Sequence, residues 1–555
     1  MADGSSKQGS SRPAWLLFAL PAGLLLAGAM IIPLLLTFWT SVAEPKAGLG
    51  NYAEFFASAT YLRILWRTIW TAALVTLVCL LLGYPYAYLM TLVGRRTRML
   101  LTVAVLVPFW TSAIVRIFGW MVLLQPSGLI NRALALVGLG PFELLGNLTG
   151  TLIGMVQVML PLMILPLYST MGRIDRRLMV AACSLGATPS GAFRKVYLPL
   201  SRPGILAGSV IVFVSSLGFY LVPQMLGSPQ QQLLSQLIFD QVSSLLNFGL
   251  GAAMAVILLA ATLLVLAATS SLTRGSSHTG TISLSSSNGH PTLTGRRPLG
   301  LGIIALFVAA ILVAPAIILV PLSFTAEASF VFPPKAWSVR WYEHFFTDGE
   351  WIGSLLASLK IALMSAIIAT ILGSLAALGI VRSRSRFTTP MLMVMLIPRV
   401  VPHVVLAVAV FAFFLVLGLV GKVSGFVIAH TALAIPLVVI TMTAGLQMLD
   451  ERLELAAASL GANRFRQILG VTAPLMLPSI LTAAVFAFVT SFDEVIISLF
   501  LQSPFLRTLP VKMFSSIQDQ IDPTIAAAST LIFLVATVTI TVSLFATGGR
   551  HAARG

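Results

Sequence analysis

The sequence has few charged residues and almost no cysteine. Asp, Glu, Lys and Arg make up 9% of the 555 residues, whereas soluble globular proteins carry about a quarter, which excludes a soluble enzyme and a disordered chain. Its two cysteines, Cys79 and Cys183, cannot build a disulfide framework or a cysteine zinc site. The six histidines, which include His403 and His430, show no metal-ligand spacing, so we expect them to serve helix packing.

A nucleotide-binding loop is also missing. The phosphate-cradling pattern G-x-x-x-x-G-K-[ST] does not occur, because Gly421-Lys422 lacks both the earlier glycine and the following hydroxyl residue. We therefore expect no catalytic residue, metal or other cofactor in this chain. Any ATP-driven activity would need ATP and Mg²⁺ bound by a partner protein.

Long apolar stretches dominate what is present, since 58% of the residues are hydrophobic. A membrane-crossing helix needs about 20 apolar residues, and twelve such stretches occur, six on each side of a Ser/Gly/Thr-rich linker at 272–297. The predicted fold class is an all-α polytopic membrane protein with 12 transmembrane helices. The spans are expected near residues 14–40, 66–91, 99–124, 149–170, 203–224, 247–271, 298–322, 353–380, 389–417, 423–445, 479–501 and 524–547.

The net charge of +17 follows the predicted topology. An even number of spans puts both termini on one side. If that side is the cytoplasm, the cytoplasmic segments hold 22 basic and 5 acidic residues, as the positive-inside rule expects. The excess charge is thereby explained without nucleic-acid binding, and the lipid bilayer is the expected surrounding.

The two halves of the chain, 1–271 and 298–555, repeat one another. Glycines, prolines and loop aromatics recur at an offset of 290 residues, which becomes 275 after an outer loop at 125–148 that is 15 residues longer in the first half. Both halves start and end inside, so the repeat is parallel. The matched pairs are Tyr52–Tyr342, Phe55–Phe345, Gly83–Gly373, Pro108–Pro398, Gly186–Gly461 and Pro199–Pro474.

The segment between the fourth and fifth spans is the most informative part of each half. It reads VAACSLGATPSGAFRKVYLPLSRPGI at 180–205 and LAAASLGANRFRQILGVTAPLMLPSI at 455–480, with 11 of 26 positions identical. We expect a helix–turn–helix elbow at 175–205 and another at 450–480. Gly186 and Gly461 should end the first helix, and the paired prolines at 199/203 and 474/478 should break the second. Two elbows suggest docking of two copies of one partner.

The elbow pattern resembles the EAA motif of ABC importer permeases, in which Ala-Ala is followed by three residues, Gly and a later Leu-Pro. In that family the loop is the coupling helix that sits in a cleft of the ATPase subunit. The family's leading Glu is here Val180 or Leu455, with Glu454 one residue earlier. The resemblance implies ATPase coupling by Val180, Ala181, Ala182, Gly186, Pro199, Glu454, Leu455, Ala456, Ala457, Gly461 and Pro474.

The finer resemblance is to spermidine/putrescine-type permeases, whose two subunits are similar to the two halves. It rests on GFYLVPQMLGSP at 218–229, FDQVSSLLNFGLGAAMAV at 239–256, FPPKAWSVRWYEHFF at 332–346 and SFDEVIISLFL at 491–501. It implies a fused pair of permeases with the type I ABC importer fold in a bacterial inner membrane, with both termini cytoplasmic. The implied partners are two copies of a cytoplasmic ATPase and a periplasmic substrate-binding protein.

Alternatives to a polyamine substrate stay open at this stage. Relatives of this fold carry ferric iron, thiamine, phosphonates, opines or sugar derivatives, and a secondary transporter also has six plus six spans. A secondary transporter needs neither a large elbow nor an ATPase. A channel or membrane scaffold leaves the twin elbows without a role.

Two carboxylates fall within the predicted eleventh span. Asp493 and Glu494 would be costly in a bilayer unless functional or paired. The resemblance places this span beside the translocation path, where a carboxylate suits a cationic substrate. The alternative is a buried ion pair with Lys360, Arg399 or Arg116. In the first half Gly218 replaces Asp493. The other candidate residues of the path are Phe492, Phe219 and Tyr220.

Overall fold

The computed structural model describes residues 13–274, 299–328, 330, 332–383, 387–519 and 522–534. Most of the predicted linker at 272–297 lies outside these residues, as does the last predicted span beyond Leu534. Within the described part, ten helices are long and apolar enough to cross a membrane, and a helix pair bent by 97° makes an eleventh. The all-helical membrane fold is thereby confirmed.

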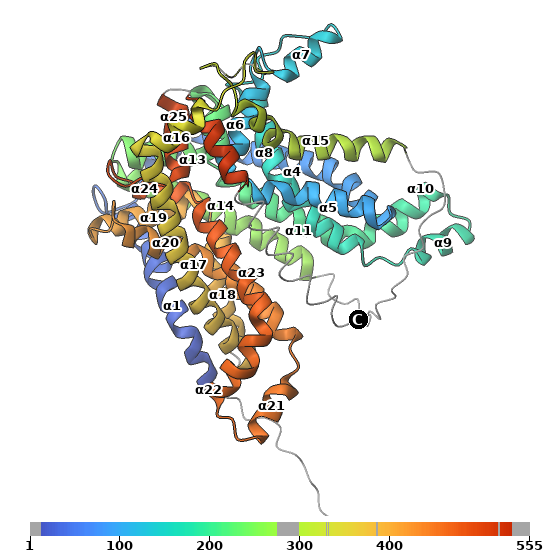
Figure 1. Ribbon diagram of the computed structural model, residues 1–555, viewed down its shortest axis with the longest axis vertical. Coiled ribbons are helices and arrows are strands. Elements are labelled where there is room, and N and C mark those ends of the chain that lie inside the picture. Colours follow the sequence, from blue (N-terminus) through green and yellow to red (C-terminus); the bar gives the residue numbers. More distant parts are fainter. Residues whose placement is uncertain are drawn as a thin grey trace, which may run out of the picture. The chain divides into compact units, whose positions relative to one another are not determined.

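The chain forms two compact units that differ from the two sequence halves (Figure 1). Among the described residues, those of 13–40 and 348–513 form unit 1, and those of 41–347 and 514–534 form unit 2. The N-terminal span therefore packs in the unit that is built mainly from the second half. The first span of the second half packs in the unit that is built mainly from the first.

Unit 1 has a core of three long helices, α17, α20 and α23, which pack against one another. The N-terminal span covers α17, α18 and α20. The helices of this unit are η1 (Pro13–Ala19), α1 (Leu20–Leu26), η2 (Ala27–Ile31), α2 (Ile32–Ala43), α17 (Gly349–Ser383), α18 (Thr388–Val400), α19 (His403–Val416), α20 (Val423–Met448), α21 (Glu451–Ser459), α22 (Arg464–Gln467), η6 (Ile468–Thr472), α23 (Ala473–Phe492), α24 (Ile496–Leu501) and α25 (Leu509–Asp519). The chain passes into unit 2 within α2 and α25.

Unit 2 has the equivalent core of α4, α8 and α11, and α15 packs against α4, α5 and α6. Its helices are α3 (Gly50–Ala57), α4 (Ala59–Leu92), α5 (Arg95–Trp110), α6 (Ala113–Leu124), α7 (Leu129–Leu136), α8 (Leu148–Met171), α9 (Arg177–Ser184), α10 (Pro189–Ala192), η3 (Phe193–Tyr197), α11 (Leu198–Leu217), α12 (Leu221–Leu226), η4 (Pro229–Gln231), α13 (Leu234–Phe239), η5 (Asp240–Ser244), α14 (Phe248–Arg274), α15 (Leu299–Leu322) and α16 (Arg340–Thr347). An apolar helix at Thr524–Leu534 also belongs to it.

Helix boundaries repeat at the predicted offsets. The pairs α3/α16 and α4/α17 start 290 residues apart, and α10/α22, α11/α23 and α12/α24 start 275 residues apart. The same close contact recurs in both cores. A Cβ at Gly83 would lie 3.1 Å from Met163, and one at Gly373 would lie 2.6 Å from Val438, its counterpart. Helix α7 lies in the longer outer loop of the first half. The repeat is therefore structural as well as sequential.

Two predicted spans have different boundaries in the structure. The fifth span of each half starts at the elbow, runs through Pro203 or Pro478 without a break, and ends at Leu217 or Phe492. The expected break at these prolines is therefore wrong. In each half a five-residue π-turn, η3 or η6, precedes Pro199 or Pro474. Proline has no N–H and crowds the carbonyl of the preceding helical turn, and the wider π-turn accommodates it.

Candidate functional site

The two elbows have the same local construction. In each, an aspartate, Asp175 or Asp450, accepts a hydrogen bond of 2.9 Å from the backbone N–H two residues later. Helices α9 and α21 then end before Gly186 and Gly461, which have φ of +88° and +84°. Glycine reaches this left-handed conformation without strain. The expected helix ends at these glycines are confirmed.

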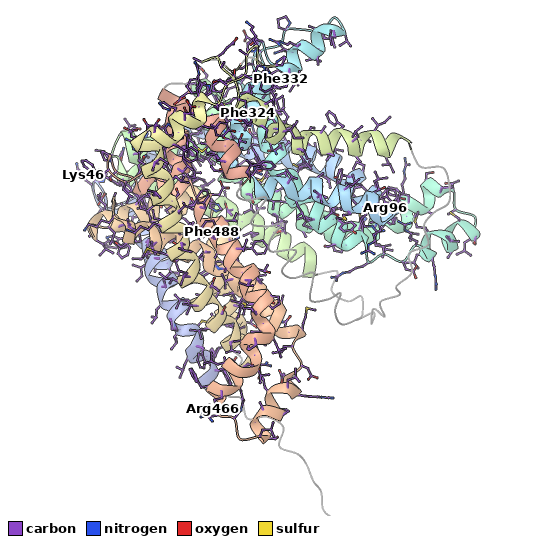
Figure 2. All side chains as sticks on the ribbon, in the orientation of Figure 1. Lys46, Arg96, Phe324, Phe332, Arg466 and Phe488 are labelled. Atoms are coloured by element: carbon purple, nitrogen blue, oxygen red, sulfur yellow. The ribbon has the colours of Figure 1, made fainter. Side chains whose placement is uncertain are left out.

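The second arm of each elbow is also capped by its own sequence. The Thr188 hydroxyl accepts a hydrogen bond of 3.1 Å from Gly191 N–H, and the Asn463 side chain accepts one of 2.9 Å from Arg466 N–H. These residues start α10 and α22, as N-caps do. Arg466, labelled in Figure 2, lies on this second arm. Local hydrogen bonds thus cap the start of the second arm in both elbows.

Large apolar side chains project from both elbows at matching positions. No side chain of α9 or α21 is buried. Val180 and Leu455 are each 66% exposed, and Leu185 and Leu460 are 88% and 89% exposed. The alanines next to these residues have short side chains, so the surface of each elbow is low beside the projecting apolar residues. Exposed apolar surface of this kind marks an interaction site. The low surface is formed by Ala181 and Ala182 in the first elbow and by Ala456 and Ala457 in the second.

Glu454 is turned toward its own half of the protein. Its carboxylate lies 2.7 Å from the guanidinium of Arg382, at the end of α17, and accepts a 2.7 Å hydrogen bond from the Thr472 hydroxyl in η6. Arg382 also pairs with Glu451 at 2.7 Å. The Arg382 side chain is 8% exposed and that of Glu454 20%. We call Arg382, Glu451, Glu454 and Thr472 the elbow clamp.

Arg382 and Thr472 were not predicted as site residues. In the sequence Arg382 is one of several basic residues after an apolar span, and charge there is explained by topology alone. The signal that could have found the clamp is its position in the repeat, because Glu451 and Thr472 have Arg176 and Tyr197 as counterparts. Residues that differ between otherwise matching elbows point to a difference in how each elbow is held.

The first elbow is held by different chemistry at the same place. The guanidinium of Arg176 donates to the backbone carbonyl of Thr91 at the end of α4. Four aromatic rings then fill the junction between α4 and η3. The ring centroid of Phe193 lies 5.7 Å from that of Tyr197 and 5.5 Å from that of Tyr88, and the centroids of Tyr88 and Tyr197 lie 5.0 Å apart. The fourth ring, Tyr84, lies 6.2 Å from Phe193 and bonds the Ser201 hydroxyl at 3.0 Å.

The predicted carboxylates of the eleventh span lie just after it. Asp493 follows the last residue of α23, and its N–H bonds the Val489 carbonyl at 3.0 Å. The Glu494 carboxylate accepts a 2.9 Å hydrogen bond from Ile497 N–H and so caps the start of α24. Placing both residues inside the span helix was therefore wrong, because the apolar run continues across a helix break. Whether Asp493 contacts substrate or an ion-pair partner stays a prediction.

The aromatic path residues flank the same break in both halves. The Phe492 ring stacks on Phe488 at 5.7 Å, and Phe488 is labelled in Figure 2. In the first half, Phe219 and Tyr220 lie between α11 and α12, and the Phe219 carbonyl accepts a hydrogen bond of 2.7 Å from the Ser235 hydroxyl. Tyr220 is buried, with its ring 4.9 Å from Phe239.

Asp240, next to Phe239, is a candidate that sequence reasoning missed. Its carboxylate accepts a 2.6 Å hydrogen bond from the Gln232 amide. Burial raises the pKa of Asp240, and the hydrogen bond from Gln232 opposes that rise. The first half therefore carries a carboxylate beside the Tyr220–Phe239 pair even though Gly218 replaces Asp493. The missed signal was the DQ pair that follows the aromatic residue in the sequence.

His430 joins the two sides of the second break. Its Nδ1 lies 2.9 Å from the Ser491 hydroxyl in α23, and its Nε2 lies 3.1 Å from the Ser498 hydroxyl in α24. The ring is fully buried. The expected packing role of this histidine is confirmed.

Comparison with known proteins identifies the family. The sequence matches the family described as "Binding-protein-dependent transport system inner membrane component" over residues 80–277 and again over 369–548. One match lies in each half of the chain and contains one elbow. Together the matches cover more than half of the chain.

Curated relatives are similar over one permease length at a time. The spermidine/putrescine transport system permease protein PotB of Haemophilus influenzae is 35% identical over 208 residues, which is 37% of this chain and 72% of the relative. PotB of Escherichia coli K12 is 32% identical over 38% of this chain and 77% of the relative. PotC of H. influenzae is 30% identical over 42% of this chain and 91% of the relative.

A solved bacterial ABC transporter involved in the import of the acidic polysaccharide alginate is 15% identical, over 46% of this chain and 94% of that chain, with a TM-score of 0.33. That likeness is too weak to carry an argument. The family matches stand without it, and they describe membrane transport components of the inner membrane rather than catalytic enzymes. This chain therefore belongs to the family of binding-protein-dependent transport system inner membrane components, and it carries the family domain twice, once in each half.

Proposed function

We propose that this chain is the complete transmembrane permease of an ATP-driven ABC importer. It moves a polyamine such as spermidine or putrescine from periplasm to cytoplasm by alternating access. The observation that carries this proposal is the pair of matching elbows, each with exposed apolar residues at the same positions. The polyamine substrate is supported by the likeness to the spermidine/putrescine permeases and by the carboxylates near the helix breaks.

The elbows are the proposed docking sites for two copies of a cytoplasmic ATPase subunit. That subunit binds ATP and Mg²⁺, because this chain has no phosphate-cradling loop. Closure of the two ATPases on ATP pushes the elbows together, and the fifth spans, which continue from the elbows without interruption, carry that motion into the membrane. A periplasmic substrate-binding protein delivers the solute on the opposite side.

The proposed orientation places both termini and both elbows in the cytoplasm. The basic residues of the elbows and of the loops after the second spans support this orientation by the positive-inside rule. Arg95, Arg96 and Arg98 follow α4, and Arg464 and Arg466 lie on the second elbow. Cysteine accessibility from each side of inverted and right-side-out vesicles measures this orientation directly.

The test of the docking role replaces the most exposed leucine of each elbow. Leu185→Ser and Leu460→Ser each remove apolar surface that a partner would bury, and full burial of a leucine contributes about 1.5–3 kcal/mol. We expect the affinity for the ATPase subunit to fall about tenfold to hundredfold per elbow. Leu139→Ser, which replaces an exposed leucine of the outer loop, is the matched control and should leave that affinity unchanged.

The test of the importer itself is transport by the reconstituted complex. In proteoliposomes, labelled spermidine should accumulate only with ATP, the ATPase subunit and the binding protein. Uptake driven by a proton gradient in the absence of the ATPase would instead establish a secondary transporter.

The role of Asp493 is tested by the substitution Asp493→Asn. It should weaken uptake of the cation while the complex still assembles. Full uptake with lower thermal stability would instead assign Asp493 to an ion pair.

A further inference from the structure

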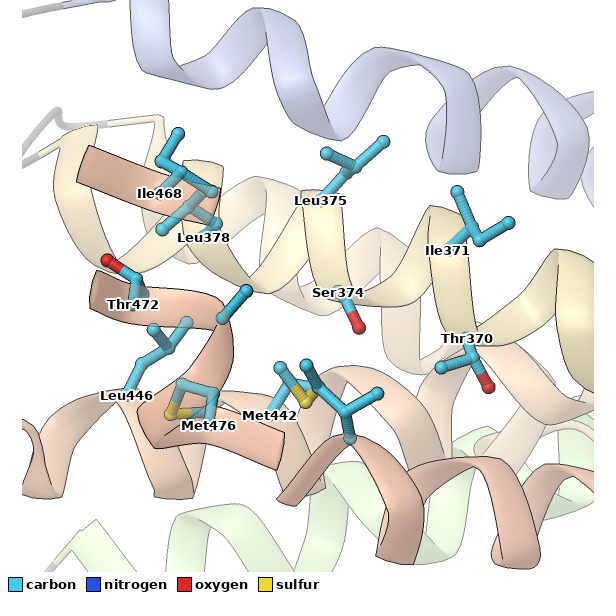
Figure 3. Close-up of a pocket in the computed structure, with 12 residues that line it drawn as sticks. Thr370, Ile371, Ser374, Leu375, Leu378, Met442, Leu446, Ile468, Thr472 and Met476 are labelled. Carbon is cyan, nitrogen blue, oxygen red and sulfur yellow. The ribbon is translucent and has the colours of Figure 1, made fainter. Parts of the chain in front are cut away.

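A pocket lies between α17, α20 and α23 at their elbow ends (Figure 3). Its volume is about 280 Å³, and its lining is almost wholly apolar. Met442 of α20 and Met476 of α23 form one wall, and Leu378 of α17 and Ile468 of η6 form another. All of these helices belong to unit 1. The hydroxyl-bearing residues of the lining are Thr370, Ser374 and Thr472.

The first half fills the equivalent place with its own aromatic rings. At the repeat offsets, Ser374, Leu378, Ile468 and Thr472 correspond to Tyr84, Tyr88, Phe193 and Tyr197. Those four rings form the cluster that holds the first elbow junction. The substitutions at Ser374 and Thr472 remove two whole phenol rings from the packing. The residues that line this part of the pocket thus stand at the positions where the first half has its aromatic cluster.

Empty space of this size is destabilising in a packed interior, because the surrounding atoms lose their contacts on one side. Ile371 lines the pocket and is 56% exposed, so the pocket reaches the surface of α17 at this residue. This residue continues an exposed apolar stripe on α17 that includes Leu363 and Ile367. On a membrane-spanning helix such a stripe faces lipid chains. Lipid acyl chains therefore lie next to the exposed side of the pocket.

We propose that this pocket binds one acyl chain of a membrane lipid from the leaflet on the elbow side. The chain supplies in the second half the contacts that the aromatic cluster supplies in the first. The pocket reaches Thr472, which bonds Glu454 of the elbow clamp at 2.7 Å. A bound chain therefore packs against the turn that connects the second elbow to its span, and it supports that elbow only.

Photolabelling tests the proposal on the full chain. The protein is placed in nanodiscs of phosphatidylethanolamine and phosphatidylglycerol that carry a diazirine at the end of one acyl chain, and labelled residues are mapped by mass spectrometry. We expect labelling at Met442 and Met476. Ser374→Tyr combined with Thr472→Tyr rebuilds two of the missing rings and should abolish labelling at both methionines. Labelling at Ile367, on the exposed stripe, should stay unchanged in both proteins.

Two further variants keep the test decisive. Ala473→Leu installs the residue that the first half has as Leu198, so it narrows the pocket if the double variant does not fold. Tyr84→Ser with Tyr197→Thr should open a pocket in the first half and bring new labelling to Leu167, the counterpart of Met442. Absence of label at Met442 and Met476 in the unaltered protein, or labelling that persists in the filled variants, would overturn the proposal.

Discussion

The elbow clamp predicts a large and local effect for one substitution, Arg382→Met. Methionine keeps the unbranched apolar length of the arginine side chain but removes the guanidinium. The change leaves Glu454, whose side chain is 20% exposed, with the Thr472 hydroxyl as its remaining clamp partner. It also removes the ion pair that Arg382 makes with Glu451, whose side chain is 51% exposed. The second elbow should therefore detach from α17 more often.

The magnitude follows from the burial of each pair. The Arg382–Glu451 pair, in which the Glu451 side chain is half-exposed, contributes about 0.5 kcal/mol. Removing one partner of a fully buried pair costs about 3–5 kcal/mol, and the partial exposure of Glu454 places its pair below that range. We expect a loss of about 2–3 kcal/mol in the free energy of opening the second elbow. Glu451→Gln, which removes only the outer pair, should cost about 0.5 kcal/mol.

Hydrogen exchange in nanodiscs measures this opening directly, because amide exchange of α21 reports local unfolding. A loss of 2–3 kcal/mol corresponds to exchange that is about 30- to 150-fold faster. The amides of α9 should be unaffected, because Arg176 holds the first elbow separately. Arg176→Met should show the converse, with faster amide exchange in α9 and an unchanged exchange rate in α21.

Unchanged exchange in α21 of Arg382→Met would refute the clamp. So would a loss of ATPase affinity in Glu454→Gln that is absent from Arg382→Met, since that pattern assigns Glu454 to the partner interface. A charge exchange, Arg382→Glu with Glu454→Arg, should recover part of the protection. This double variant separates the ion pair from the size and shape of either side chain.

Three further substitutions test a helix contact, the turn of the second elbow and the buried histidine. Gly373→Ala places a Cβ 2.6 Å from Val438 and should lower thermal stability by about 1–3 kcal/mol, whereas Gly470→Ala, with open space around it, should not. Gly461→Ala forces alanine to φ of +84°, which costs about 1–2 kcal/mol, and should lower the solute imported per ATP in proteoliposomes. His430→Phe removes two buried hydrogen bonds and should cost about 2 kcal/mol, seen as faster exchange in α24.

The repeat and the elbows were predictable because they rest on residues with strong local preferences. Glycine at a left-handed position acts through the backbone within a few residues, so the sequence alone locates these helix ends. The expected ends of α9 and α21 at Gly186 and Gly461 agree with the structure for this reason. Prolines were less informative about where a helix ends, because a π-turn accommodates Pro199 and Pro474 and the helix continues.

Partner choice between helices could not be predicted. An apolar span such as Leu299–Leu322 is suited to many neighbours, and its sequence does not state that it packs on α4, α5 and α6. The pocket was hidden for a related reason. Ser374 and Thr472 are ordinary membrane-helix residues, and their meaning emerges only when the structure brings them together and the first half supplies Tyr84 and Tyr197 for comparison.

The placement of the first span in unit 1 sets an order of events during synthesis. Residues 13–40 enter the membrane early, but the helices that cover them begin at residue 348. At about 5–20 residues per second, roughly 300 further residues take about 15 to 60 s to translate. The first span must wait in the bilayer for that time with its packing face against lipid. The first span of the first half packs in unit 1, and the first span of the second half, α15, packs in unit 2. Because one chain carries both spans, each unit receives this helix from the same molecule and does not have to find it by diffusion.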